Sequence, residues 1–253
     1  MNAIQDLVVY TCITGGYDEL RPVSAPEAGV HYVCFSDGRT ADAAGWEMRP
    51  LPQAFESPAL ANRFVKMHPH LLFPECERSV YVDGNVEFGA GVKALADSAL
   101  RAHGMALFAH PFRDCVYEEA VECAAIGHDW IWKFERHMSR YRRQGLPARQ
   151  GMFECNVLFR SHHAPAVVAM MQAWWHEFIR GAKRDQLSFP YVAWQLQVPL
   201  NNLGHSGMRA GQGVFRLHAD HLSDTRLRQL RGYANRLLPP FWLAARRTGW
   251  QPR

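Results

Sequence analysis

Short apolar segments alternate along this chain with stretches of helical character, and this alternation is the strongest constraint on its fold. The predicted strands are residues 7–13, 31–35, 79–82, 105–109, 153–159 and 214–217. Helices are predicted from 57 to about 69, over 91–102, 115–144 and 164–181, and after 184. Strands that alternate with helices form a largely parallel sheet with helices packed on its faces. The sequence therefore predicts an α/β fold with a mixed, mostly parallel sheet flanked by helices.

The length and composition suit one large globular α/β domain. The chain has 253 residues, of which 48% are apolar and 21% charged, so a sizeable core is expected. No apolar run reaches the roughly 18 residues of a membrane span, and the N-terminus lacks the pattern of a signal peptide. We therefore expect a cytoplasmic protein. The six cysteines form no CxxC pair, and we expect free, mostly buried thiols.

Positive charge is concentrated at the C-terminus. Residues 224–253 hold seven Arg and one Asp, a net +6, whereas the whole chain carries +4, so the remainder carries −2. Large apolar residues are interleaved with these arginines. Such a segment can lie on an anionic membrane surface, or it can be a helix packed on the body with a basic outer face. The near-neutral body argues against nucleic acid as a partner.

Four predicted strands end in polar or glycine-rich residues. The four ends are residues 14–18, 36–37, 83–85 and 110. In open α/β sheets, ligands bind beyond the carboxyl ends of the strands. We therefore expect these loops to converge on a ligand site, although polar residues are common in loops of any kind.

The segment Asp83-Gly84-Asn85 directly follows a predicted strand and carries the sharpest chemical signal. An acidic residue followed two positions later by a polar one can hold a divalent metal and the diphosphate of a nucleotide. Mg²⁺ and Mn²⁺ prefer oxygen ligands, and such an ion can neutralise a departing diphosphate. His218 or His221 could complete this site, although a lone histidine is more often structural. The tripeptide is also a common turn sequence.

Two further groups of residues could act on a substrate. Arg63 and Lys66 lie three residues apart on one helical face, where they could reach phosphates or form a solvated basic face. Asp185 could serve as a general base or orient a donor sugar. It could equally be an acid placed favourably at the start of a helix.

Four sequence blocks together resemble a known family. They are residues 10–18, 81–85, 110–120 and 184–189. The chain resembles, over about residues 7–197, the glycosyltransferase-like family shared by bacteria and plants and first described as a domain of unknown function. The resemblance implies a GT-A-type fold with a layout similar to the family-8 retaining transferases. One plant branch is linked to cell-wall polysaccharide synthesis and another to ceramide hydrolysis.

The resemblance also implies roles for individual residues. It implies that Thr11, Thr14 and Tyr17 lie near the nucleotide base and that Arg63 and Lys66 face the diphosphate. It puts Asp83 and Asn85 at a Mn²⁺ or Mg²⁺ ion, with Asn85 replacing the usual second acid. It puts Asp185 and Gln186 beside the donor sugar.

We therefore expect a glycosyltransferase that uses a nucleotide sugar, with UDP as the nucleotide, and builds a polysaccharide or glycolipid. Residues 1–223 would form the glycosyltransferase-like domain, and residues 224–253 a basic tail that contacts the inner membrane. Two alternatives remain: a hydrolase of lipid amides, and a non-catalytic protein that binds nucleotide sugars.

Overall fold

The computed structural model describes residues 5–218 and 225–237, which divide into two compact units that interleave along the sequence. Within the described residues, the first unit comprises 5–109, 154–175 and 198–218. The second comprises 110–153, 176–197 and 225–237. None of the helices in this part of the chain is long and apolar enough to cross a membrane.

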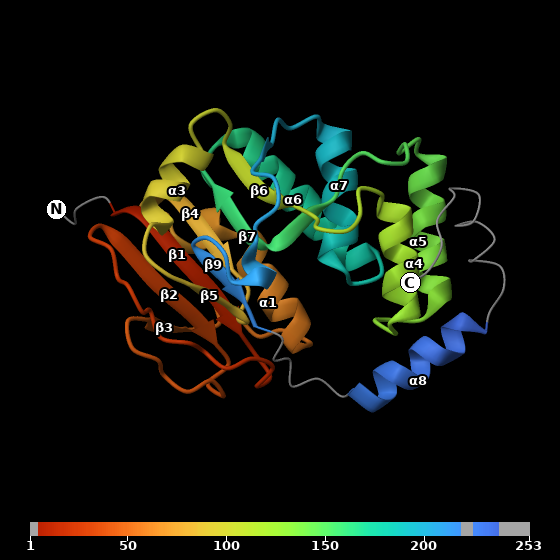
Figure 1. Cartoon of the computed structure of the whole chain (residues 1–253), viewed down its shortest axis with the longest axis horizontal. Helices are drawn as coiled ribbons and strands as arrows, with labels where there is room; N and C mark the ends of the chain where they lie inside the picture. Colours follow the sequence, from red (N-terminus) through yellow and green to blue (C-terminus); the bar gives the residue numbers. More distant parts are fainter. Residues whose placement is uncertain (1–4, 219–224, 238–253) are drawn as a thin grey trace. The chain divides into compact units, whose positions relative to one another are not determined.

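The first unit is built on a seven-stranded sheet with the order β3-β2-β1-β4-β7-β6-β8 (Figure 1). Its strands are β1 (Gln5–Ile13), β2 (Val30–Ser36), β3 (Glu47–Pro50), β4 (Cys76–Val82), β6 (Met105–Ala109), β7 (Phe153–Arg160) and β8 (Asn201–Asn202). β1 pairs in parallel with β2 and β4, as do β2 with β3 and β6 with β8, whereas β4 and β7 are antiparallel. The expected mixed, mostly parallel sheet is therefore confirmed.

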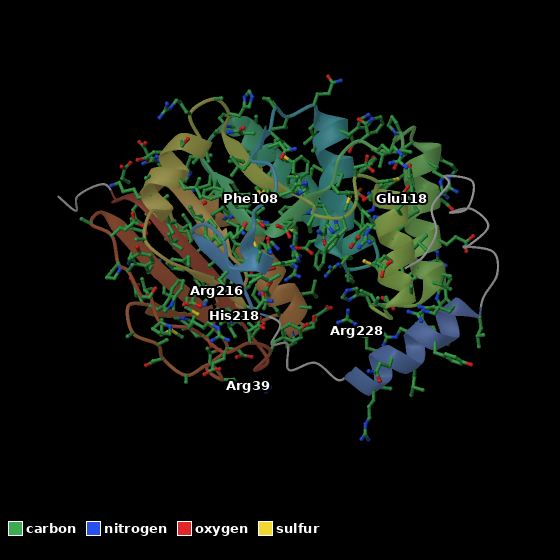
Figure 2. All side chains as sticks on the ribbon, viewed as in Figure 1. Arg39, Phe108, Glu118, Arg216, His218 and Arg228 are labelled. Atoms are coloured by element: carbon green, nitrogen blue, oxygen red, sulfur yellow. The ribbon has the colours of Figure 1, made fainter. Side chains whose placement is uncertain are left out.

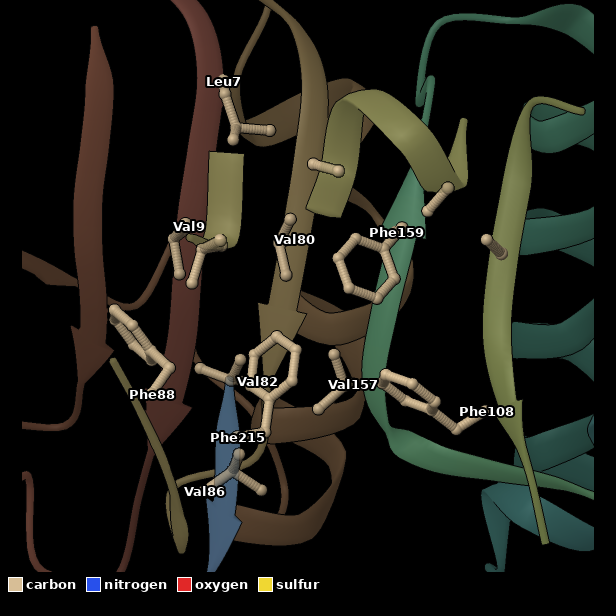
Figure 3. Packing of buried hydrophobic residues seen from close by; sticks show 14 of the residues in the cluster. Leu7, Val9, Val80, Val82, Val86, Phe88, Phe108, Val157, Phe159 and Phe215 are labelled. Carbon is tan, nitrogen blue, oxygen red and sulfur yellow. The ribbon is translucent and has the colours of Figure 1, made fainter. Parts of the chain in front are cut away.

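One face of this sheet carries the main apolar core (Figure 3). Leu7 and Val9 of β1 and Val80 and Val82 of β4 point into it, because alternate residues of a strand share a face. The core is covered by α3 (Val92–Ala99) and by a two-stranded antiparallel sheet of β5 (Val86–Phe88) and β9 (Phe215–Leu217). The first unit also contains the short elements α2 (Pro69–Leu72) and η1 (Met208–Ala210).

Helix α1 (Pro58–Met67) is held by hydrogen bonds against the face of the sheet opposite the main apolar core. Ser57 caps α1: its hydroxyl accepts a hydrogen bond from the Leu60 N–H at 3.3 Å. Near the other end of α1, the fully buried Arg160 guanidinium donates to the Lys66 carbonyl at 2.7 Å and to the Tyr10 hydroxyl at 2.5 Å. The Tyr10 hydroxyl donates to the same carbonyl at 3.0 Å. These bonds fix the position of Lys66 against the sheet.

The second unit is helical. It contains α4 (Val116–Ala125), α5 (Ile131–Arg143), α7 (Asp185–Leu196), α8 (Thr225–Arg236) and the end of α6 (Pro165–Arg180). Glu177 of α6 accepts two hydrogen bonds from the Arg140 guanidinium, at 2.9 and 2.6 Å, and a third from the Tyr141 hydroxyl at 3.1 Å. This partly buried ion pair is satisfied by a two-pronged contact that suits the planar guanidinium.

The prediction of one helical region over 115–144 is wrong, because residues 126–130 are not helical and separate α4 from α5. Gly127 lies just after α4 with a φ of +75°, a conformation that favours glycine. The buried Asn235 side chain of α8 satisfies this corner. It donates to the Ala124 and Asp129 carbonyls at 2.8 and 2.9 Å and accepts from the Ile131 N–H at 3.1 Å.

The start of the basic tail forms α8, which packs on α4 (Figure 2). Gly232 permits the close approach, since a Cβ there would lie 2.7 Å from the Ala125 carbonyl oxygen. The Arg228 and Arg231 guanidinium groups donate to the carbonyls of Ile126 and His128 at 3.1 and 3.0 Å. The packed-helix alternative therefore holds for residues 225–237, whereas 224 and 238–253 lie outside the described residues.

All six cysteines are buried and free, as expected. Two buried histidines make the folded protein less stable at acidic pH. Burial lowers the pKa of His137 from 6.5 to about 4, and that of His162 likewise to about 4. The His137 Nδ1 accepts the Ala182 N–H at 3.2 Å, so the folded chain holds a neutral ring. Below pH 6.5 the unfolded chain therefore binds protons that the folded chain does not, and protonation favours unfolding.

We predict that the free energy of unfolding falls as the pH is lowered from about 6.5 to about 4, by roughly 3 kcal/mol for each of these histidines. Urea unfolding followed by circular dichroism at several pH values measures this change. The His137→Gln variant should show a shallower pH dependence, whereas the variant of an exposed histidine, His176→Gln, should follow the wild type. An unchanged slope in His137→Gln would contradict the prediction.

Candidate functional site

Asp83 lies immediately beyond β4, at the carboxyl end of the strand. Its backbone N–H donates to the Asn156 carbonyl at 2.8 Å, which holds the turn against β7. Its carboxylate Oδ1 accepts the Tyr81 hydroxyl at 2.9 Å and lies 3.4 Å from the Lys66 ammonium. Tyr81 and Asp83 are two residues apart, so strand geometry places them on one face. The carboxylate is 28% exposed and is thus open to a ligand.

Lys66 is the buried partner of this carboxylate. Its side chain is only 1% exposed, and its ammonium lies 5.0 Å from the Tyr81 ring centroid and 6.0 Å from that of Trp174. Burying a charged amine is unfavourable unless an opposite charge or ring faces compensate for the lost water. Asp83 and the two aromatic rings provide that compensation.

The Tyr81 hydroxyl stays protonated in this environment. Burial, and secondarily the negative charge of Asp83, raises the pKa of Tyr81 well above its usual value. The phenol therefore keeps its proton and donates a hydrogen bond to the Asp83 carboxylate. Tyr81 is not among the site residues predicted from the sequence. Its position in a predicted strand, two residues before Asp83, is the signal by which it could have been found.

A small cavity adjoins Asp83 on the side of the apolar core. It has a volume of about 10 Å³, room for about one water molecule. Its lining includes Thr11, Arg21, Trp46, Asp83, Gly84 and Glu87. The Thr11 hydroxyl is buried and has no hydrogen-bond partner among the described residues. A buried hydroxyl without a partner is unfavourable, so a ligand that bonds to it would be stabilised.

Gly84 allows the loop after β1 to approach this turn closely. A Cβ at residue 84 would lie 2.8 Å from Asp18 Oδ2 and 2.9 Å from Ile13 Cγ1. The adjacent loop is tied down by the Thr14 hydroxyl, which donates to the Pro58 carbonyl at 2.9 Å. Tyr17, in the same loop, is 43% exposed. Of the three residues expected at a nucleotide base, Thr11 lines the cavity, Thr14 anchors the loop and Tyr17 is open to solvent.

Arg63 lies one turn before Lys66 on α1 and is partly buried. Its guanidinium donates to the Asn62 side-chain oxygen, and the Asn62 amide donates to the Cys12 carbonyl at the end of β1 at 2.5 Å. The positive charge of Arg63 also acts on Tyr81 and Cys12. The helix thus directs two cations toward the carboxyl ends of β1 and β4.

The side chains expected to bind a metal do not converge on one point, because each contacts other groups of the protein. The pairing of β5 with β9 brings Asn85 and His218 together, and the Asn85 amide nitrogen donates to the His218 carbonyl at 2.9 Å. The His218 imidazole, labelled in Figure 2, instead contacts Glu87 Oε2 at 2.8 Å. Asp83 contacts Lys66 and Tyr81. His221 lies outside the described residues.

These contacts do not fit a divalent cation. Mg²⁺ and Mn²⁺ require several oxygen ligands that are not already neutralised. The Asp83 carboxylate already faces an ammonium ion, and the Asn85 amide is held by the β5–β9 connection. Within residues 5–218 and 225–237, no group of three or more His, Cys, Asp or Glu side chains could hold a metal.

Asp185 and Gln186 belong to the second unit, at the start of α7. Asp185 is the first residue of the helix and is 3% exposed, a position in which a carboxylate interacts favourably with the helix dipole. The Gln186 amide nitrogen donates to the Phe153 carbonyl at 3.0 Å, and its oxygen accepts from Arg184 at 3.2 Å. These contacts anchor the start of α7, and the catalytic roles of both residues stay predictions.

The solved structures to which this chain is distantly similar include two glycosyltransferases. The crystal structure of mouse xyloside xylosyltransferase 1 in its apo form is 10% identical, with a TM-score of 0.46, covering 78% of this chain and 84% of that one. The apo structure of the bifunctional glycosyltransferase WbbM is also 10% identical with a TM-score of 0.46. That match covers 80% of this chain but only 39% of WbbM. No curated protein matches the sequence.

Comparison with family models identifies the chain. The model described as "TOD1/MUCI70, glycosyltransferase-like domain" matches residues 49–205, more than half of the sequence. The matched segment contains Lys66, Asp83 and Asp185. The resemblance seen in the sequence and the expectation of a glycosyltransferase-type enzyme are thereby confirmed, and the mostly parallel sheet with flanking helices agrees with a GT-A-type fold. The chain belongs to the TOD1/MUCI70 glycosyltransferase-like family.

Proposed function

We propose that this protein transfers a sugar from a nucleotide-sugar donor, with UDP as the nucleotide, to a polysaccharide or glycolipid acceptor. The observation that carries the proposal is the paired Asp83 and Lys66 at the carboxyl end of β4, beside a cavity lined by the unpartnered Thr11 hydroxyl. Such strand ends are where α/β sheets bind ligands. The family match supports the same class of reaction.

In this proposal, the ends of β1 and β4 receive the donor. Thr11 would hydrogen-bond to the nucleotide, with Thr14 and Tyr17 in the loop beside the base. Arg63 and Lys66 would balance the charge of the diphosphate. The cavity of about 10 Å³ is far smaller than a nucleotide, so the loop that follows β1 must move when the donor binds.

The chemical step places demands on the groups around the donor. The bond between the anomeric carbon and the diphosphate oxygen breaks, and its electron pair leaves with the diphosphate. The acceptor oxygen forms the new bond and gives up its proton to a base. Cationic groups near the diphosphate lower the energy of the charge that develops on it. We retain Asp185 and Gln186 as the predicted residues at the donor sugar, with Asp185 as the candidate base.

The expected Mn²⁺ or Mg²⁺ cofactor stays a prediction with which the contacts of Asp83, Asn85 and His218 disagree. The hydrolase alternative would favour a compact cluster of metal-binding histidines and acids, which is not found among the described residues. A non-catalytic nucleotide-sugar binding protein would bind the same donor as a transferase but would form no product.

We also propose that residues 224–253 form a functional segment distinct from 1–223, with α8 contacting the anionic face of the inner membrane from the cytoplasm. α8 exposes Leu227, Leu230 and Tyr233 by 60%, 67% and 67%. Residues 225–237 contain four Arg and no acid. A hollow of about 740 Å³ between α4 and α8 is lined by Arg226, Leu230 and Tyr233 among others. Apolar side chains flanked by arginines suit an anionic lipid surface.

UDP should raise the melting temperature of the purified protein more than AMP or GDP does, because a ligand that binds only the folded state stabilises it. A thermal-shift panel of nucleotides and nucleotide sugars, each with and without Mn²⁺, measures this. A flat response across the panel would contradict the donor site. A UDP response without transfer or donor hydrolysis would favour the non-catalytic alternative.

Asp83→Ala should abolish sugar transfer while the protein still folds, because it removes the carboxylate that positions Lys66. The measurement is release of UDP from the donor that gives the largest thermal shift, with circular dichroism as the folding check. Asp97→Ala is the matched control, since Asp97 pairs with Arg78 at 2.6 Å on the surface of the same unit. Full activity in Asp83→Ala would remove the proposed site.

Leu230→Ser combined with Tyr233→Ser should weaken co-sedimentation with vesicles that contain phosphatidylserine, because it removes two exposed apolar side chains from α8. Raised salt should weaken binding of the wild type. Leu71→Ser is the control, since Leu71 is 61% exposed but lies in the first unit. Equal sedimentation of the double variant and the wild type would contradict membrane docking through α8.

A further inference from the structure

The environment of Asp83 contains an internal cation in a fixed position. The Lys66 ammonium lies 3.4 Å from Asp83 Oδ1, and the Lys66 side chain is almost fully buried. The Lys66 carbonyl accepts hydrogen bonds from Arg160 and Tyr10, at 2.7 and 3.0 Å, so the backbone from which the ammonium extends is anchored. The ammonium is therefore a built part of the site and not a mobile surface charge.

This cation lies beside the carboxylate oxygen Oδ1 of Asp83. An ammonium ion and a divalent cation compete for the same oxygen, and each weakens the binding of the other by charge repulsion. Asp83 Oδ1 also accepts the Tyr81 hydroxyl at 2.9 Å. Asn85, whose amide carries no charge, adds little attraction for a metal.

The third expected metal ligand is also engaged. The His218 imidazole contacts the Glu87 carboxylate at 2.8 Å. The His218 N–H donates to the Asn85 carbonyl at 2.9 Å, and the His218 carbonyl accepts from the Asn85 side-chain amide at 2.9 Å. Recruiting His218 to a metal would break the contact with Glu87. The site therefore offers a cation of its own and a poor set of ligands for another.

We propose that this protein binds the diphosphate of its donor without a divalent cation, because the Lys66 ammonium neutralises the Asp83 carboxylate and the Arg63 guanidinium supplies the remaining positive charge. Arg63, one turn earlier on α1, adds a second cation on the same helix. When the bond to the sugar breaks, the electron pair that moves onto the diphosphate is balanced by these side chains. Asp83 then acts as the residue that positions the ammonium. This inference rests on the proposed function, since it concerns the same donor site.

The inference is tested with UDP as the probe and the full chain, by isothermal titration calorimetry after exhaustive chelation with EDTA and again with Mn²⁺. The expected dissociation constants agree within about threefold. Lys66→Arg should retain metal-free binding, and Lys66→Gln should weaken it at least about tenfold. Lys93→Gln is the matched control, because Lys93 is a lysine of the same unit that pairs with Asp6 at the surface.

A gain of metal dependence separates this role of Lys66 from a purely structural one. Once the ammonium is removed in Lys66→Gln, Asp83 becomes available to a metal, so added Mn²⁺ should restore part of the UDP binding. The Mn²⁺ electron paramagnetic resonance signal reports the bound ion directly, and circular dichroism checks that the variant is folded. If Lys66→Gln does not fold, the wild-type comparison with and without EDTA still decides the matter.

The outcomes distinguish this inference from the proposed function. UDP binding by the wild type that disappears in EDTA and returns with Mn²⁺ would overturn the metal-free site and leave the glycosyltransferase proposal standing. UDP binding that is absent under every condition would overturn both. Binding that is equal with and without Mn²⁺, and lost in Lys66→Gln, supports the assignment.

Discussion

The contact on which the candidate site depends is the pair of hydrogen bonds that the buried Arg160 makes with the Lys66 carbonyl and the Tyr10 hydroxyl. Arg160 ends β7, Tyr10 lies in β1 and Lys66 lies near the end of α1, so one guanidinium joins two strands and a helix. Burial raises the pKa of Tyr10 to about 12, which keeps the phenol as a neutral partner. Because Arg160 is fully buried, replacing it with an apolar residue would leave the carbonyl and the hydroxyl less well satisfied.

The fixed α1 explains why the turn after β4 can carry a single acid. Lys66 places a positive charge under Asp83, and the two rings of Tyr81 and Trp174 face the ammonium. A second carboxylate at residue 85 would add a negative charge with no further cation held in this way. The amide of Asn85 instead joins β5 to the chain after β9 through the His218 carbonyl. The replacement of a second acid by Asn85 and the burial of Lys66 thus have the same physical reason: the site holds one carboxylate for one ammonium.

The sequence predicts five strands of the seven-stranded sheet and the turn at Asp83, because continuous apolar runs and strand ends are local signals. It misses β3 and β8, which are short and lie at the two edges of the sheet. It does not predict which way α1 faces. The spacing of Arg63 and Lys66 is compatible with a solvated basic face, yet Lys66 is buried, since the direction of a helix face depends on tertiary packing. The sequence also does not predict the pairing of β5 with β9, because the two segments lie about 130 residues apart in the chain, as the partners Glu87 and Arg216 show.

The same limit applies to the basic tail, for which the sequence allowed either a packed helix or a membrane-binding segment. Asn235 shows that the two are compatible within α8. Its buried amide satisfies the corner between α4 and α5, and Gly232 lets the helices approach, so the inner face of α8 is fixed by polar bonds and close backbone contact. The large apolar side chains Leu227, Leu230 and Tyr233 of the same helix are nevertheless exposed. Leu230 and Tyr233 are each 67% exposed, so burying these side chains in a lipid surface would add binding energy.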